Sequence, residues 1–247
     1  VWLTNLVQGN GPFTNLTSAY SVAFSTNRLL AIAAPNYNAV TLVDAANGAA
    51  PVWRAVLRDG VGGFNDLANP RAVAFSGSIL AIAAAVDNAV TLVDVSNPAN
   101  PLLRSVIKDG LNGFTNLAGA VTLAFNGNLL VIGASGDSAL TLVDVSNPAS
   151  PVLRSTLRSG VGGFNSLDKP FGLAIQANLL AVSDLLNGAV SLIDVSIPTG
   201  PVLRSVISNS VAGFDVSAYP EGVAFNGNLL AIGTRLGGAV SLLDGSA

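Results

Sequence analysis

Residues 93–114 read VDVSNPANPLLRSVIKDGLNGF, and residues 143–164 read VDVSNPASPVLRSTLRSGVGGF, so one unit returns after 50 positions with few changes. Related copies stand at residues 43–64 and 193–214. One aspartate recurs at the same step throughout the chain, as Asp44, Asp94, Asp144, Asp194 and Asp244. A repeat of this length is typical of a β-propeller blade, whereas β-helices use much shorter repeats and helical solenoids show a 3.6-residue periodicity.

Each copy contains four short strand-like runs, which in the second copy cover residues 71–75, 79–84, 89–95 and 102–108. Ser76-Gly77 and Asn126-Gly127 stand between the first two runs and predict a two-residue hairpin turn, because such turns need positive φ angles. The proline-rich stretch 96–98 predicts a connection, since proline cannot donate to a sheet. We therefore predict an all-β, five-bladed β-propeller with four antiparallel strands per blade.

The two ends of the sequence predict how the blades close. Residues 1–13, VWLTNLVQGNGPF, match residues 52–64, VWRAVLRDGVGGF, position for position, while the last copy stops after its third run at 239–244. Because an open sheet edge is a liability, we expect the N-terminal strand to complete the last blade (1+3 closure). This predicts one domain over residues 1–247, with blades at about 19–58, 70–108, 120–158, 170–208 and 220–244 plus 1–8.

The segments LVDVSNPANPLLRSV, LVDVSNPASPVLRST and LIDVSIPTGPVLRSV resemble LVIVD-type repeats of bacterial secreted and surface β-propellers. The pattern GF…P…VAF…GN is also similar to NHL repeats. The resemblance implies propeller blades and an extracellular or cell-surface location. It implies no particular chemistry, because such repeats serve mostly as interaction scaffolds. The chain contains no methionine, so we expect a mature form from which any signal peptide has been removed.

Composition excludes several classes of function. The chain has no histidine and no cysteine, which removes histidine triads, thiol catalysis, disulfides and nearly every zinc site. Eleven Lys+Arg against 14 Asp+Glu give a formal charge of −3, without the basic stripe that nucleic-acid binding requires. No apolar run approaches about 18 residues, so no membrane insertion is expected. Loops such as 109–112 lack the dense acidic spacing of a calcium loop, and we expect neither metal nor cofactor.

Residues that recur in every copy are interpreted as structural. The recurring phenylalanines predict a core between blades. The five aspartates each precede a turn and are expected to accept hydrogen bonds from backbone N–H groups two residues on. The recurring arginines of the outer strands are expected to guard the sheet edge or to pair with these aspartates; they are Arg54, Arg104, Arg154 and Arg204.

Residues that break the repeat are free for another task. Where the chain enters the innermost strand, the copies carry Tyr20, Arg71, Val121, Phe171 and Glu221. These positions predict the mouth of a central channel, with Arg71 as the countercharge of Glu221. Further such residues in loops of the same face are Tyr37, Tyr219, Asp184 and Arg235. The pattern predicts a glycan or small-ligand site on this face, and ordinary loop variability is the competing interpretation.

A five-bladed-propeller glycosidase is a third hypothesis. Glycoside hydrolysis usually needs two carboxylates across the scissile bond. The channel mouth offers Glu221 alone, and only Asp184 or Asp168 is at hand in the loops to supply a partner. No nucleophile–base motif is present, so we expect no enzymatic activity and no catalytic residues.

The closing strand lacks the charges of the other outer strands. Leu3 stands where Arg54 stands, and Val7 stands where Arg58 stands. The edge formed by Val1, Leu3, Asn5 and Val7 therefore predicts self-association or contact with a neighbouring domain. The competing interpretation is an edge that faces solvent or is covered by residues upstream in the natural chain. The favoured function is a non-enzymatic extracellular or surface scaffold for protein interaction and self-assembly; the ligand-binding module and the glycosidase are the alternatives.

Overall fold

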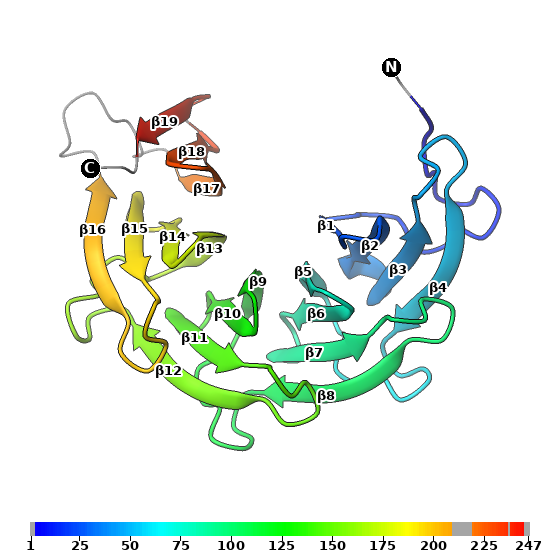
Figure 1. The fold of residues 1–247 in the computed structure, drawn as a ribbon, viewed down its shortest axis with the longest axis horizontal. Helices are drawn as coiled ribbons and strands as arrows, with labels where there is room; N and C mark the ends of the chain where they lie inside the picture. Colours follow the sequence, from blue (N-terminus) through cyan, green and yellow to red (C-terminus); the bar gives the residue numbers. More distant parts are fainter. Residues whose placement is uncertain (1–2, 209–218, 237, 245–247) are drawn as a thin grey trace.

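The computed structural model describes residues 3–208, 219–236 and 238–244, which form five antiparallel sheets arranged in an open arc (Figure 1). We number these sheets as blades I to V in chain order. Blade I contains β1 (Ser21–Phe24), β2 (Leu29–Ala34), β3 (Ala39–Asp44) and β4 (Val52–Arg58), with a short 3-10 helix, η1, at Pro35–Tyr37. Blade II contains β5 (Pro70–Ser76), β6 (Ile79–Ala84), β7 (Ala89–Asp94) and β8 (Leu102–Lys108).

The remaining blades repeat this order. Blade III contains β9 (Ala120–Asn126), β10 (Leu129–Ala134), β11 (Ala139–Asp144) and β12 (Val152–Arg158). Blade IV contains β13 (Pro170–Gln176), β14 (Leu179–Asp184), β15 (Ala189–Asp194) and β16 (Val202–Ser208). Blade V contains β17 (Pro220–Asn226), β18 (Leu229–Thr234) and β19 (Val240–Asp244). The first strand of each blade lies on the inside of the arc, and the fourth strands of blades I to IV lie on its outside (Figure 1).

The hairpin turn between the first two strands lies one residue later than the sequence predicts. Asn126 pairs with Leu129, so Gly127 and Asn128 form the turn. Gly127 has a φ of 58°, whereas Asn128 is not among the residues with positive φ. A positive φ at the first central residue alone fits a type II′ turn rather than the type I′ turn that Asn-Gly favours.

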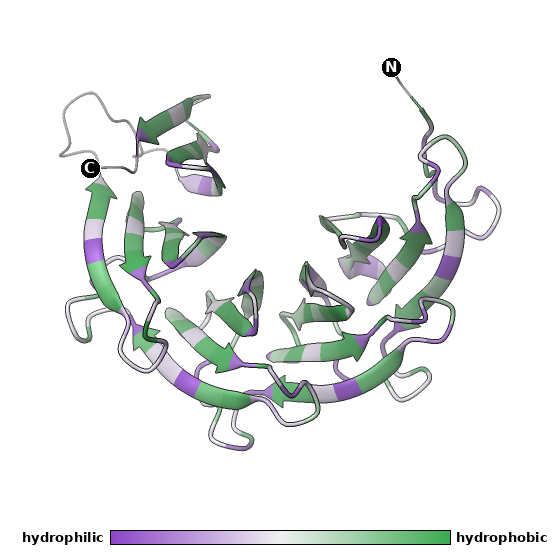
Figure 2. Cartoon of the chain, in the orientation of Figure 1, coloured by the Kyte–Doolittle hydropathy of each residue, from purple (hydrophilic) through white to green (hydrophobic). Residues whose placement is uncertain are grey.

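Adjacent blades bury a shared apolar core. The face that a blade presents to the next blade along the chain is its forward face, and the opposite side is its rear face. Val40 and Leu42 on the forward face of blade I pack with Leu80 and Ile82 on the rear face of blade II, and all four are 5% exposed or less. The middle strands are therefore mainly hydrophobic, while polar bands interrupt the outer strands (Figure 2).

Hydrogen bonds add to this packing at the outer strands. The Ser105 hydroxyl in blade II donates to the Pro148 carbonyl of blade III at 2.6 Å. The Ser155 hydroxyl in blade III donates to the Pro198 carbonyl of blade IV at the same distance, 2.6 Å. Each blade is thus joined mainly to its immediate neighbours in the chain.

The predicted 1+3 closure is not present in this structure. Blade V has three strands, residues 3–7 form no strand, and the two ends of the arc lie apart (Figure 1). Val1 and Trp2 lie outside the described residues. The forward face of blade V is consequently exposed: Val240 and Leu242 are 70% and 62% accessible, whereas the equivalent residues of blade III, Leu140 and Leu142, are 0% accessible.

The N-terminal segment packs on blade I instead. Leu6, Phe13 and Leu16 contact the rear face of blade I at Ile32 and Val43. The equivalent residues Leu57, Phe64 and Leu67 pack in the same way against the rear face of blade II. This segment therefore occupies the place of an outer strand and loop of a preceding blade. Elsewhere on the rear face of blade I, Val22 and Phe24 of β1 are 63% and 62% exposed.

The open arc predicts different costs for the same substitution in blades III and V. Leu142→Ala should lower the free energy of unfolding by about 2–5 kcal/mol, because it opens a cavity in a packed core. Leu242→Ala, at the equivalent position, should change it by only about 0.5 kcal/mol or less, because its side chain is already in solvent. Urea unfolding of both variants measures the difference, and an equal loss at Leu242 would show that this face is covered in solution.

Candidate functional site

The connections between strands lie on two opposite faces. The fourth-to-first and second-to-third connections share the loop face, where the Asn38 side-chain oxygen accepts from the Asn69 N–H at 2.9 Å. The hairpin turns and the third-to-fourth connections share the turn face, where the Val145 N–H donates to the Asn128 carbonyl at 2.8 Å. The predicted ligand-binding residues belong to the loop face.

The predicted channel-mouth residues sit at irregular points of the inner strands. Arg71, Phe171 and Glu221 each lie at a register shift between the first and second strands of their blades. Such bulges re-aim a side chain relative to a regular strand. Tyr20 directly precedes β1, where its N–H donates to the Ala33 carbonyl at 2.9 Å. The repeat-breaking side chains are therefore set apart from the regular ladder.

The expected pairing of Arg71 with Glu221 is wrong. Arg71 lies over the Tyr20 ring at 4.8 Å, and its Nε donates to the Asn69 side-chain oxygen at 2.7 Å. Glu221 pairs with Arg235 instead, at 3.4 Å. Arg235 follows β18 in the same blade as Glu221, whereas Arg71 belongs to blade II, so the arc separates Arg71 from Glu221.

Asp184 is a structural anchor in this structure and presents no surface to a ligand. Asp184 is 0% exposed, and its carboxylate accepts from the N–H groups of Asp168 and Lys169 at 2.9 and 3.1 Å. It also accepts from the Leu186 N–H and from the backbone and side chain of Asn187. The Asn187 amide binds Asp168 as well, so these two carboxylates hold one loop together. Among the described contacts, neither aspartate reaches Glu221.

The remaining predicted residues are dispersed around the arc. The Tyr37 hydroxyl accepts from the Gln8 side chain at 3.2 Å in blade I. Tyr219, 41% exposed, has a φ of 57° at the start of blade V. Tyr20 and Arg71 form one group, Glu221 and Arg235 another, and Phe171 stands in blade IV. Because the ring is open, the structure does not assemble these residues around one enclosed mouth.

A close backbone contact fixes blade V to blade IV beside Glu221. A Cβ atom added at Gly172 would lie 2.2 Å from the Glu221 carbonyl oxygen, so only glycine fits there. The Ser183 hydroxyl accepts from the Gly172 N–H at 2.8 Å and donates to the Glu221 carbonyl at 3.1 Å.

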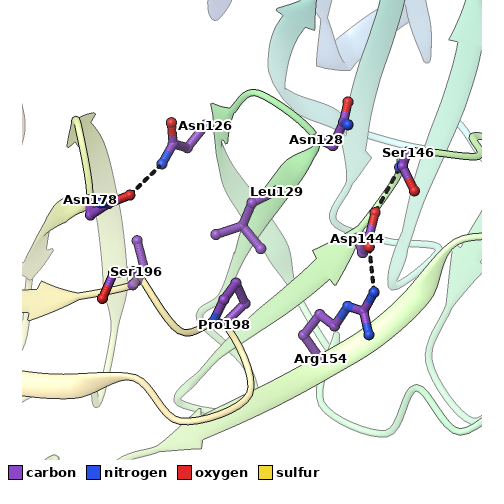
Figure 3. A pocket seen from close by; sticks show the side chains of 10 residues that line it. Asn126, Asn128, Leu129, Asp144, Ser146, Arg154, Asn178, Ser196 and Pro198 are labelled. Atoms are coloured by element: carbon purple, nitrogen blue, oxygen red, sulfur yellow. Dashed lines mark hydrogen bonds and ion pairs between the residues drawn. The ribbon is translucent and has the colours of Figure 1, made fainter.

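The repeat aspartates of blades I to IV accept from the backbone N–H two residues on, as predicted, and they pair with the outer-strand arginines, which is one of the two roles expected of those arginines. In blade III, Asp144 pairs with Arg154 at 2.5 Å and accepts from the Ser146 N–H at 2.8 Å, two residues on (Figure 3). The same arrangement recurs in the other four-stranded blades, as Asp44–Arg54, Asp94–Arg104 and Asp194–Arg204. The Arg154 guanidinium and the Ser146 N–H lower the pKa of Asp144 to about 2. These pairs close the third-to-fourth connection.

The described residues contain no cluster of three or more side chains suited to hold a metal ion. Within the same part of the chain, no helix has the length and apolar character needed to cross a bilayer.

The five sheets and the cores between them define a repeat protein of the β-propeller type. The LVIVD repeat model matches residues 71–108 and 120–158, which cover most of blades II and III. The chain thus carries LVIVD repeats, as the sequence resemblance indicated. No curated protein matches it.

Solved propellers have a similar fold. The β-propeller domain of Myceliophteria thermophila Cps50 (Swd1) gives a TM-score of 0.65 at 16% identity, covering 87% of this chain and 65% of that one. A chain of the nidogen/laminin complex gives 0.62 at 12% identity, covering 92% and 75%. The periplasmic gluconolactonase PpgL of Pseudomonas aeruginosa gives 0.64 at 14% identity, covering 87% and 62%. This chain thus spans less than two thirds of the Cps50 and PpgL chains, 65% and 62%, and the likeness shows the fold alone.

The lowered aspartate pKa values predict loss of stability in acid. A folded-state pKa of about 2 at Asp94 and Asp144 lies below the unfolded value, so these pairs stabilise the fold at pH values above about 4 and less as the pH falls towards 2. Asp144→Asn should therefore flatten the dependence of Tm on pH between about 4 and 2.

Arg158→Gln is the matched control, because Arg158 lies on the same strand and makes no ion pair among the described contacts. Thermal unfolding at several pH values measures the effect. An Asp144→Asn profile parallel to that of the unmodified chain would contradict the role of this pair.

Proposed function

We propose that the protein is a non-enzymatic interaction scaffold that acts outside the cell, and that the two ends of its arc are its interaction surfaces. One end is the forward face and free edge of blade V. The other is the rear face of blade I with the segment of residues 3–17. The observation that carries the proposal is the exposure of Val240, Leu242, Val22 and Phe24 at positions that are buried or partly buried in the other blades.

The two ends are complementary by the rule that joins every other pair of blades. At the junctions inside the chain, a pair of Val or Leu side chains on the third strand of one blade packs against the first and second strands of the next blade. The N-terminal segment has the sequence of a fourth strand, and blade V lacks one. Pairing residues 1–8 with β19 would complete a four-stranded blade and cover both apolar faces.

This joint can form within one chain or between two. Within one chain it would close a five-bladed disc by 1+3 pairing, which requires a tighter curvature than the arc has. Between chains it would join the head of one copy to the tail of the next, and such contacts build rings or filaments. The separation of the two ends in the arc favours joining between copies, and we propose self-assembly on this basis.

Other observations support the absence of catalysis and the interaction role. The predicted loop-face residues do not converge, and Asp184 and Asp168 are committed to loop structure. The LVIVD repeats of this chain resemble repeats of bacterial secreted and surface propellers, and this resemblance supports an extracellular location. One similar fold comes from a protein complex, nidogen/laminin.

A pair of cysteines tests the joint directly, because the chain contains no cysteine of its own. Thr41 pairs with Val56 and Ser191 with Val206, and the equivalent pair across the joint is Ser241 with Asn5. In the double variant Asn5→Cys and Ser241→Cys, oxidation should give covalent oligomers on a non-reducing gel.

Ser191→Cys with Val206→Cys is the positive control, which should cross-link within one chain. A cross-linked monomer of the test variant would refute self-assembly and establish the closed disc. A failure of the test variant to cross-link, with a working control, would remove the joint altogether.

The exposed N-terminal edge gives a second test. Leu3 and Val7 are 58% and 50% exposed. Leu3 stands where the other copies carry arginine, and Val7 stands where three of them carry arginine or lysine. The double variant Leu3→Arg and Val7→Arg should reduce the mass measured by light scattering to that of one chain, because charge guards a strand edge against pairing. An unchanged oligomer, or a monomer before substitution, would defeat self-association through this edge.

A further inference from the structure

We propose that the hollow between blades III and IV on the turn face is a binding site for a small neutral polyhydroxylated ligand, such as a single pyranose unit. This site lies on the face opposite the loops from which the sequence predicts ligand binding. Most of its residues recur in the other blades, and recurrence by itself indicates a structural role.

The hollow is formed by two blades together. Blade III contributes the turn after β9, the end of β11 and the first residues of β12, and blade IV contributes the turn after β13 and the loop after β15 (Figure 3). Its volume of about 310 Å³ lies at the lower limit of ligand pockets, about 300–1,000 Å³, and so suits a ligand of one ring. Leu129 and Pro198 supply apolar surface, against which the C–H face of a sugar ring can pack.

Three asparagines at the rim have hydrogen-bonding capacity to spare. Asn126 uses its amide N–H on the Ala177 carbonyl at 2.6 Å, which leaves its own carbonyl oxygen as an acceptor. Asn178 meets only the amide of Asn126, at 3.5 Å, so its N–H₂ group remains a donor. The Asn128 side chain makes no hydrogen bond to the described residues. Donors and acceptors thus stand together, as hydroxyl groups require.

The charge of the hollow favours a neutral ligand. Its single carboxylate and its single guanidinium are Asp144 and Arg154, which bind each other at 2.5 Å. Asp144 is further satisfied by Ser146. A charged ligand would have to compete with this pair, whereas a hydroxyl group can add a hydrogen bond without breaking it.

The junction between blades I and II shows what distinguishes this site. It has the same plan, with Asp44, Ser96 and Pro98 in the corresponding places. Ser78 stands there in place of Asn178, and the hollow measures only about 120 Å³. The III–IV junction therefore combines more amide side chains with a larger volume than the I–II junction.

The test uses the ¹⁵N-labelled full chain and four neutral probes: the methyl glycosides of glucose, galactose, mannose and N-acetylglucosamine. At least one should shift the side-chain amide signals of Asn126, Asn128 and Asn178 saturably. Asn178→Ala should weaken that binding about fivefold, the loss expected for one hydrogen bond. Ser78→Ala is the matched control in the I–II junction and should leave the affinity unchanged. Both positions are turn residues at the surface, so neither substitution threatens the fold.

Glucuronate and glycerol complete the design. Glucuronate should bind no more tightly than the methyl glucoside, and glycerol should give no saturable shift. The proposal is overturned if none of the four probes shifts these signals saturably, if Asn178→Ala binds as well as the unmodified chain, or if glucuronate binds more tightly than the neutral sugars. These results concern the turn face alone and leave the arc-end joint untouched.

Discussion

Every blade of this protein has two apolar faces, and inside the chain the neighbouring blade covers each of them. The four junctions inside the chain bury these faces at the same repeat positions each time, with a Val or Leu pair on the third strand against the second strand of the next blade. The ends of the arc bury them only in part, since the N-terminal segment covers Ile32 and Val43 but not the rest of the rear face of blade I. The case for an assembly role follows from the side chains left uncovered at the two ends, which are Val22, Phe24, Val240 and Leu242.

The order of strands could be predicted because it depends on local patterns. The runs 79–84 and 102–108 coincide with β6 and β8, since apolar runs bounded by turn residues specify a strand without reference to the rest of the chain. The Asp–Arg pairs could be predicted for the same reason, being ten residues apart in each copy. Closure of the ring could not be predicted, because it depends on the angle between blades. That angle results from many small contacts and leaves no periodic signal.

The candidate site was harder to predict from the sequence than the strands. Comparing the copies separates recurring residues from unusual ones. On that basis the sequence predicts Asp184 and an Arg71–Glu221 pair as parts of a ligand site. Asp184 proved to be unusual because one loop needs a different anchor, with five hydrogen bonds to a single carboxylate. The hollow between blades III and IV was overlooked because a site built from two copies of a recurring pattern does not stand out in either copy. Its signal in the sequence is the occurrence of Asn126, Asn128 and Asn178 in or beside the first hairpin turns of two successive blades.

The hydroxyl bridges from Ser105 to Pro148 and from Ser155 to Pro198 join only successive blades. Linkage of this kind makes the chain behave as a one-dimensional array, in which the stability of each module depends on how many neighbours it has. A central blade has two neighbours and a terminal blade has one. Backbone amides should therefore exchange with solvent in a gradient from the ends towards blade III, and unfolding should begin at the termini and spread inward rather than strike the whole molecule at once.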